Sequence, residues 1–235
     1  MARPPSLDDA SGTGVRQNAM TKRRPIYFGK ALYDDQFSRT LASAYAGMAD
    51  LGEAFAVAGL IGPHAPPDTW FEGWNDMAVA VEKAAAEAAA AGHALSTRKG
   101  FLRASEYYRQ AFFFIRHLLD DDRLRRAYAD HVRTFAAAGP DFGIAHGVAV
   151  EIPYEDTTLH GWLFSPDDSG VARPTVLLPD GYDSTAEEML SYGVGALTRG
   201  YNVVTFDGPG QGKALYADRI YMRRDFEAVV TPVVD

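Results

Sequence analysis

The residues with the clearest capacity for chemistry form the turn Asp180-Gly181-Tyr182-Asp183, which directly follows the apolar run Thr175 to Pro179. Such a short apolar run is typical of a strand buried on both faces. Ser184 and Thr185 offer N-cap oxygens, and a glutamate follows each after three residues, which is the spacing of a capping box. A helix is therefore predicted to begin here. Its N-terminus and the N–H groups of the turn would stabilise an anion or a developing oxyanion.

A second candidate is the glycine-rich stretch Asp207-Gly208-Pro209-Gly210-Gln211-Gly212. A phosphate loop needs four residues between its first glycine and Gly-Lys, followed by Ser or Thr, whereas this stretch has three and is followed by Lys213-Ala214. Nucleotide binding is therefore not predicted. The stretch is predicted to be architectural, with glycines at positive φ and the Asp207 carboxylate capping local N–H groups.

Metal and cofactor chemistry finds no support in the sequence. The chain has no cysteine, and no histidines and carboxylates have the spacing of a zinc site. The aspartates of Asp120 to Asp122 lack the alternating pattern of a calcium loop and are better explained as a helix start. His93 and His117 are predicted to lie on helices, exposed to solvent. We expect neither a metal nor a cofactor.

The two candidate stretches, 180–183 and 207–212, each follow a predicted strand, and these strands must hold both stretches at one edge of a sheet. Thr175 to Pro179 and Tyr201 to Phe206 flank the predicted helix, which ends at Gly200 in the left-handed position. This strand–helix–strand order predicts a sheet that is at least partly parallel. Upstream, alternating residues at 148–152 and 158–164 flank a short turn and predict a β-hairpin.

Residues from about 34 to 139 are predicted to form an all-helical block. One helix is expected from Asp34 to near Gly59, because apolar residues recur there at intervals of three and four. That apolar set consists of Phe37, Leu41, Tyr45, Met48, Leu51 and Phe55. Three further helices have predicted starts near Asp68, Ser96 and Asp120. Gly92 and Gly139-Pro140 are predicted stops. Beyond the second strand, a last helix is predicted to start near Asp225.

Composition narrows the class of protein. A chain of 235 residues with 47% hydrophobic content can bury one large or two small cores. The net charge of -8 argues against a general nucleic-acid binder. No apolar run reaches the length of a membrane span, and the first residues lack the apolar core of a signal peptide. We therefore predict a cytoplasmic protein with no nucleic-acid and no membrane partner. Residues 1–25 are predicted to form a disordered leader.

Four stretches, taken together, resemble the α/β-hydrolase superfamily, in the helical-cap branch that includes 2,6-dihydroxypseudooxynicotine hydrolase and the FrsA-like esterases. These stretches are 71–77, 103–109, 180–188 and 205–212. The resemblance covers about residues 30 to 235 and implies an α/β fold. A helical cap domain at 26–142 would be followed by the first strands of an α/β-hydrolase sheet at 143–235.

The resemblance also implies roles for particular residues. The turn after the third strand supplies an oxyanion-hole N–H in the family, which maps to Gly181 and Tyr182; an ordinary strand-to-helix turn is the alternative. Glu106, Tyr107 and Tyr108 could bind a small-molecule substrate beneath the cap, although aromatic residues at helical spacing also suit a core. Family members cleave esters, amides or activated carbon–carbon bonds with a Ser-Asp-His triad.

The sequence departs from this family in one respect. The nucleophile elbow G-x-S-x-G does not occur, and Ser191, which comes nearest, lacks the first glycine and lies inside a predicted helix. All six histidines precede the strand–helix–strand unit, whereas the base comes last in the family. We therefore predict an N-terminal fragment, truncated before the elbow, that lacks the triad and is inactive alone.

Two functions stay open on this evidence. As the first part of an esterase-like serine hydrolase, the chain would expose an apolar strand edge at 175–179, so we expect poor solubility or a homo-oligomer. Alternatively, the chain is a non-catalytic protein that keeps the cap and partial core to bind a small ligand or a partner helix. The substrate, and the choice among ester, amide and carbon–carbon cleavage, are open as well.

Overall fold

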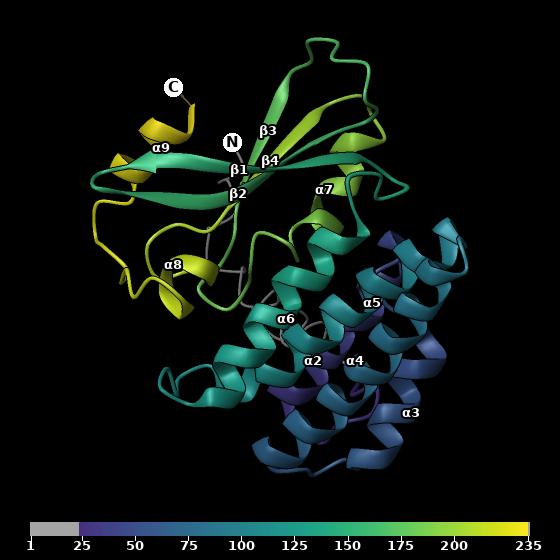
Figure 1. Cartoon of the computed structure of the whole chain (residues 1–235). Helices are drawn as coiled ribbons and strands as arrows, with labels where there is room; N and C mark the ends of the chain where they lie inside the picture. Colours follow the sequence, from purple (N-terminus) through teal and green to yellow (C-terminus); the bar gives the residue numbers. More distant parts are fainter. Residues whose placement is uncertain (1–23, 235) are drawn as a thin grey trace, which may run out of the picture.

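The computed structural model describes residues 24–234, in which a layer of helices packs against a four-stranded sheet (Figure 1). The predicted leader at 1–25 lies outside the described residues except for its last two. The helical layer consists of α2 (Ala31–Ser43), α3 (Leu51–Ile61), α4 (Pro67–Ala90), α5 (Ala94–Phe112) and α6 (Asp122–Ala138). Short 3-10 turns, Ala44–Ala46 and Phe113–Ile115, follow α2 and α5. The predicted all-helical block is thus confirmed.

The first predicted helix is wrong in its length, because α2 and α3 replace it. Gly47 has a φ of 77°, which ends the first segment in the left-handed region that glycine enters without strain. Asp50 then caps α3, since its carboxylate accepts a hydrogen bond of 3.1 Å from the Glu53 N–H. The break turns the face of the second segment, so Leu51 is 53% exposed and Phe55 is 44% exposed.

The remaining helix boundaries follow local signals in the sequence. Gly92, with a φ of 76°, ends α4 as predicted. The Asp121 carboxylate caps α6 by accepting from the Arg123 N–H at 2.8 Å, and Gly139-Pro140 follows its last turn. The predicted cap at Ser96 is wrong, because α5 already begins at Ala94.

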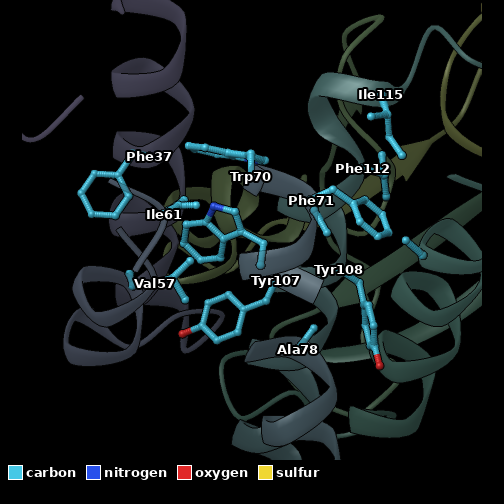
Figure 2. Packing of buried hydrophobic residues seen from close by; sticks show 14 of the residues in the cluster. Phe37, Val57, Ile61, Trp70, Phe71, Ala78, Tyr107, Tyr108, Phe112 and Ile115 are labelled. Atoms are coloured by element: carbon cyan, nitrogen blue, oxygen red, sulfur yellow. The ribbon is translucent and has the colours of Figure 1, made fainter. Parts of the chain in front are cut away.

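An aromatic core holds the helical layer together (Figure 2). Trp70 and Trp74 of α4 are fully buried, and their ring centroids lie 5.7 Å apart. The Trp70 indole N–H donates to the Gln110 carbonyl at 2.7 Å, so its polar atom is satisfied inside the core. Tyr107 packs against Trp74 with a centroid distance of 5.5 Å. This packing fixes α5 against α4.

The sheet consists of β1 (His146–Tyr154), β2 (Thr157–Ser165), β3 (Thr175–Pro179) and β4 (Asn202–Phe206) in the order β1-β2-β4-β3. β1 and β2 form the predicted antiparallel hairpin. β3 and β4 pair in parallel, which confirms the predicted partly parallel sheet. Among residues 24–234, β3 has β4 as its one neighbour, so β3 is an edge strand.

The connection from β3 to β4 differs from its prediction. The helix was predicted to begin at Ser184 or Thr185, but α7 spans Leu190–Leu197, and the residues before it form turns. The Thr185 hydroxyl does accept from the Glu188 N–H at 3.3 Å, so the capping signal is partly realised. The two glutamates of the expected capping box instead turn inward to charged groups of other elements. Gly200 adopts the predicted left-handed conformation, with a φ of 84°.

Helices α8 (Gly212–Tyr216) and α9 (Glu227–Val234) complete the described chain. The helix predicted near Asp225 is confirmed by α9, which packs against β1 (Figure 1). A second apolar core joins the helical layer to the sheet, where Phe135 of α6 meets Trp162 and Phe164 of β2. Apolar side chains from both layers therefore fill the boundary between them.

Candidate functional site

Gly181 and Tyr182 lie at the carboxyl end of β3, as predicted, and both are exposed to solvent. The Gly181 carbonyl accepts from the Ser184 N–H at 3.2 Å, which closes the turn. Within residues 24–234, the N–H groups of Gly181 and Tyr182 have no hydrogen-bond partner. The Arg116 guanidinium lies 5.9 Å from the centre of the Tyr182 ring, so the helical layer reaches this turn. Two backbone donors are thus available to an external acceptor.

The segment Asp183 to Glu188, which we call the junction segment, connects this turn to both layers. Arg39 of α2 donates from one nitrogen to Asp183 at 2.9 Å and from another to both carboxylate oxygens of Glu188, at 2.8 and 2.9 Å. The Ala186 carbonyl accepts from the Thr205 hydroxyl of β4 at 2.8 Å. The segment is therefore tied to α2 on one side and to the sheet on the other.

Glu187 is the most enclosed charge of the junction segment. Its Oε1 lies 2.8 Å from His160 Nε2 and accepts from the Trp162 indole N–H at 3.2 Å, and both partners belong to β2. Its Oε2 lies 3.5 Å from His131 Nε2 of α6. Burial alone would raise the pKa of Glu187, but the neighbouring His131 and His160 outweigh burial and hold this pKa well below its ordinary value. Glu187 is therefore a carboxylate that bridges the two layers.

Asp207, at the end of β4, performs the capping role predicted from the sequence. Its two oxygens accept from the Ala186 and Lys213 N–H groups, each at 2.7 Å. Burial and the charge of Glu187 nevertheless raise the pKa of Asp207 to about 6. The carboxyl oxygens of Asp180 have no donor among residues 24–234, and burial and Asp207 raise the pKa of Asp180 well above its ordinary range. Burial and the neighbouring carboxyl groups therefore disfavour the charged form of Asp180.

The three predicted substrate-binding residues are all buried, and their polar atoms contact different partners. Glu106 accepts from Arg109 at 2.7 and 2.8 Å and from the Thr40 hydroxyl at 2.6 Å. Burial raises the pKa of Glu106, but Arg109 outweighs this and lowers it. The hydroxyls of Tyr107 and Tyr108 point in different directions (Figure 2).

Each tyrosine hydroxyl meets a carboxylate of the helical layer. Tyr107 donates to Glu53 at 2.8 Å, and Tyr108 donates to Glu82 at 2.8 Å. Tyr108 also lines a cavity of about 250 Å³ between α4 and α6, whose wall includes Phe71. Substrate binding by Glu106, Tyr107 and Tyr108 stays a prediction.

Ser105 lies beside His131 in an arrangement that the sequence did not suggest. Ser105 Oγ is 2.9 Å from His131 Nδ1, but Nδ1 is also 2.9 Å from the Ser105 carbonyl, and Oγ is 2.9 Å from the His131 carbonyl. Because carbonyl oxygens only accept, Nδ1 carries a proton for one carbonyl and Oγ donates to the other. Nδ1 then has no lone pair with which to activate Oγ. Both side chains are fully buried, so the pair joins α5 to α6.

Among residues 24–234, the other titratable groups add no further candidate site. His93 and His117 are exposed, as predicted, but they lie in the connections before and after α5 rather than on helices. Within residues 24–234, no group of three or more histidine and carboxylate side chains is arranged to hold a metal ion. In the same part of the chain, no helix has both the length and the apolar character needed to cross a membrane.

Sequence reasoning missed the charged residues of the boundary. Arg39, His131 and His160 lie 27 to 149 positions away from the glutamates that they contact. The one available signal was that His131 and His160 stand at positions that face the core in otherwise amphipathic elements. A charged or titratable residue at such a position needs a buried partner.

Comparisons with known proteins bear on this arrangement. No family model matches the sequence. Hydrolase acrC of Aspergillus aculeatus is 35% identical over 224 residues, which cover 89% of this chain and 52% of the relative. Alpha/beta hydrolase xenA of Xenoacremonium sinensis is 34% identical over 209 residues, which cover 87% of this chain and 48% of the relative. The crystal structure of 2,6-dihydroxy-pseudo-oxynicotine hydrolase superposes with a TM-score of 0.66 at 24% identity, over 83% of this chain and 52% of that one.

Over its described residues, the chain has the fold of α/β-hydrolases and is similar to them in sequence. The predicted resemblance and fold class are thereby confirmed. The chain spans about half the length of the curated relatives it matches. The described residues provide the helical cap and the first strands of the sheet, with the turn at Gly181 and Tyr182 and the junction segment between them.

The protonation of His160 gives the stability of this protein a testable pH dependence. Burial lowers the pKa of His160, but Glu187 outweighs it, and the pKa rises to about 9. With an unfolded value of about 6.5, the stabilisation is complete below pH 6.5 and is lost as pH rises through 9. We expect the free energy of unfolding, from urea titrations, to fall by about 2 kcal/mol between pH 7 and 9.5. No cysteine titrates in this window.

The matched variant is His160→Gln, which removes the titrating group at nearly constant volume. Its unfolding free energy is expected to change by less than about 0.5 kcal/mol over the same pH range, because the imidazole that titrates there has been removed. A wild-type protein whose stability stays flat from pH 7 to 9.5 would show that His160 is neutral in the fold.

Proposed function

We propose that these residues form the cap and the first strands of a serine hydrolase that cleaves an ester, an amide or an activated carbon–carbon bond of a small molecule. The turn from Asp180 to Asp183, which we call the oxyanion turn, would supply its oxyanion donors. The observation that carries the proposal is the pair of unpaired N–H groups at Gly181 and Tyr182, at the carboxyl end of a parallel strand and beside the cap. The relatives that are named hydrolases support the reaction class.

The turn is proposed to act by electrostatic stabilisation of an oxyanion. When a nucleophile attacks a carbonyl carbon, the carbonyl oxygen becomes an oxyanion, and fixed N–H donors lower the energy of that state. Gly181 and Tyr182 present such donors without needing to reorganise, because the junction segment fixes the chain that follows them. The helical layer lies beside this turn, where the Arg116 guanidinium is 5.9 Å from the centre of the Tyr182 ring.

The nucleophile is proposed to lie outside these 235 residues. The sequence contains no G-x-S-x-G, and the buried Ser105 hydroxyl is committed to a carbonyl oxygen. Ser191 is committed in the same way, since its hydroxyl donates to the Glu188 carbonyl at 2.9 Å. Attack, proton transfer and leaving-group protonation therefore require a triad that these residues do not supply, and the chain alone is expected to be inactive.

A fluorophosphonate probe, which reacts with activated serines, is expected to leave the 235-residue chain unlabelled. A product whose reading frame continues past Asp235 into a G-x-S-x-G motif is expected to be labelled. In that longer product, Tyr182→Pro removes one N–H donor and should slow labelling about 100- to 1000-fold. Tyr182→Ala, which keeps the N–H, is the control. Labelling of the 235-residue chain, or equal rates for the two variants, would contradict the proposal.

A second candidate function is non-catalytic binding of a small apolar ligand. It is favoured by a groove of about 460 Å³ between α6 and α8, at the boundary of cap and core. Tyr128 and Tyr216 form part of its wall, with ring centroids 5.2 Å apart, together with Ala129, Val132 and Ala217. A stop codon directly after Asp235, together with a native monomeric chain, would favour this candidate over the hydrolase.

A further inference from the structure

The oxyanion turn is held between two anchored residues. On the sheet side, the Asp180 carbonyl accepts a hydrogen bond from the Gln211 side-chain amide, and the amide oxygen of Gln211 accepts from the Gly208 N–H at 2.9 Å. On the cap side, the Asp183 carboxylate accepts from Arg39 at 2.9 Å. The two N–H donors between these anchors can hold their direction only while both anchors hold.

The cap-side anchor depends on the shape of the Arg39 guanidinium. One nitrogen serves Asp183, a second serves both oxygens of Glu188, and the same nitrogen lies 3.4 Å from the Ser184 hydroxyl. The Arg39 side chain is 17% exposed and that of Glu188 is 3% exposed, so water screens the contact little. A planar fork makes these contacts together, whereas a lysine ammonium presents a single charged point.

Glu188 keeps a second counter-charge when Arg39 is removed. Arg109 of α5 lies 3.6 Å from Glu188 and is itself held by Glu106. Thr40, the neighbour of Arg39 in α2, donates to Glu106 at 2.6 Å. Loss of Arg39 therefore leaves no buried carboxylate entirely unpaired, and the chain is expected to fold without it. The contact that is lost completely is the one to Asp183.

We propose that Arg39 is a positioning residue for the oxyanion turn. Through Asp183 and Glu188 it transmits the position of the cap to the N–H donors of Gly181 and Tyr182. The helical layer then contributes to the reaction without touching the reacting atoms. An effect of Arg39 on catalysis rests on the proposed function. The mechanical claim, that Arg39 orders the turn, does not rest on it.

The absence of cysteine allows a direct test of the mechanical claim. A nitroxide label attached through Tyr182→Cys, at a side chain that is 65% exposed, reports the mobility of the turn by electron paramagnetic resonance. In the Arg39→Ala background, the rotational correlation time of the label is expected to fall at least about threefold, because the cap-side anchor is lost. Arg39→Lys should give an intermediate value.

The matched control is Arg103→Ala. Arg103 forms an ion pair of 2.9 Å with Glu53 at similar exposure, but both residues lie inside the helical layer. Its removal is expected to leave the label unchanged. As a second readout, exchange of the Ser184 amide proton, which is bonded to the Gly181 carbonyl, should accelerate about tenfold with Arg39→Ala. The Asp207 amide, bonded to the His160 carbonyl, should not respond.

Equal label mobility and equal Ser184 exchange in Arg39→Ala and Arg103→Ala would overturn the inference. If Arg39→Ala fails to fold, Asp183→Asn tests the same contact at a side chain that is 26% exposed, with a smaller increase in mobility expected. Neither readout involves turnover. A failure of the fluorophosphonate prediction would therefore reject the hydrolase and leave the Arg39 result standing. A turn that stays rigid in Arg39→Ala would reject the positioning role, whatever the result with the fluorophosphonate probe.

Discussion

Replacing Glu187 with alanine is expected to lower the free energy of unfolding by about 3 to 5 kcal/mol at pH 7, which is the cost of leaving a buried charge without its partner. His160 is 7% exposed and, with a pKa of about 9, is protonated at this pH. It would lose its hydrogen bond of 2.8 Å, and the Trp162 indole N–H would lose its acceptor. The measurement is urea denaturation followed by circular dichroism.

Two further variants separate charge from volume in this experiment. Glu187→Gln keeps the side-chain size and one acceptor but removes the charge, so it is expected to lose about half as much unfolding free energy as Glu187→Ala. Its unfolding free energy should also rise less than that of the wild type when the pH is lowered from 9 to 7. Glu87→Ala removes an exposed glutamate of α4 and is expected to change stability by less than about 0.5 kcal/mol. A Glu187→Ala protein as stable as Glu87→Ala would show that the buried bridge does not stabilise the fold.

The elements that could be predicted from the sequence are those whose limits are set locally. Gly92 and Gly139-Pro140 end helices because of their own backbone preferences, and the hairpin at 148–164 follows from alternation and a turn. Gly47 shows the limit of this approach. Its apolar neighbours continue a helical period, but its left-handed conformation breaks the helix, and the Asp50 cap that restarts it was present in the sequence.

The boundary of cap and sheet could not be predicted in the same way. Glu187 and Glu188 fit a capping box, which is a local pattern, but they are held by side chains far away in the sequence. No local rule states that a carboxylate will meet an arginine 149 residues earlier. The turn of Gly181 and Tyr182 does follow β3, as predicted, and its role stays a prediction, whereas the residues that fix its geometry emerged only from the fold.

Gly212→Ala is expected to lower the free energy of unfolding by about 3 to 5 kcal/mol, through steric overlap and backbone strain together. A methyl group at this position would lie 2.2 Å from three atoms of the Asp207 carboxyl group, and Gly212 has a φ of 30°. Asp207 cannot move aside without breaking its hydrogen bonds to the Ala186 and Lys213 N–H groups. Thermal and urea unfolding would measure the loss.

The control is Gly200→Ala, at a glycine with a φ of 84° and no atom within 4 Å of the added methyl group. It carries the strain of the left-handed region without the overlap, so a loss of about 1 kcal/mol is expected. The difference between the two variants measures how firmly Asp207 is fixed. If both cost the same, Asp207 yields to the methyl group, and the two hydrogen bonds that join the junction segment to α8 are not rigid. A larger loss at Gly212 would establish that the glycine of this turn is required by the carboxylate beside it rather than by its backbone angle alone.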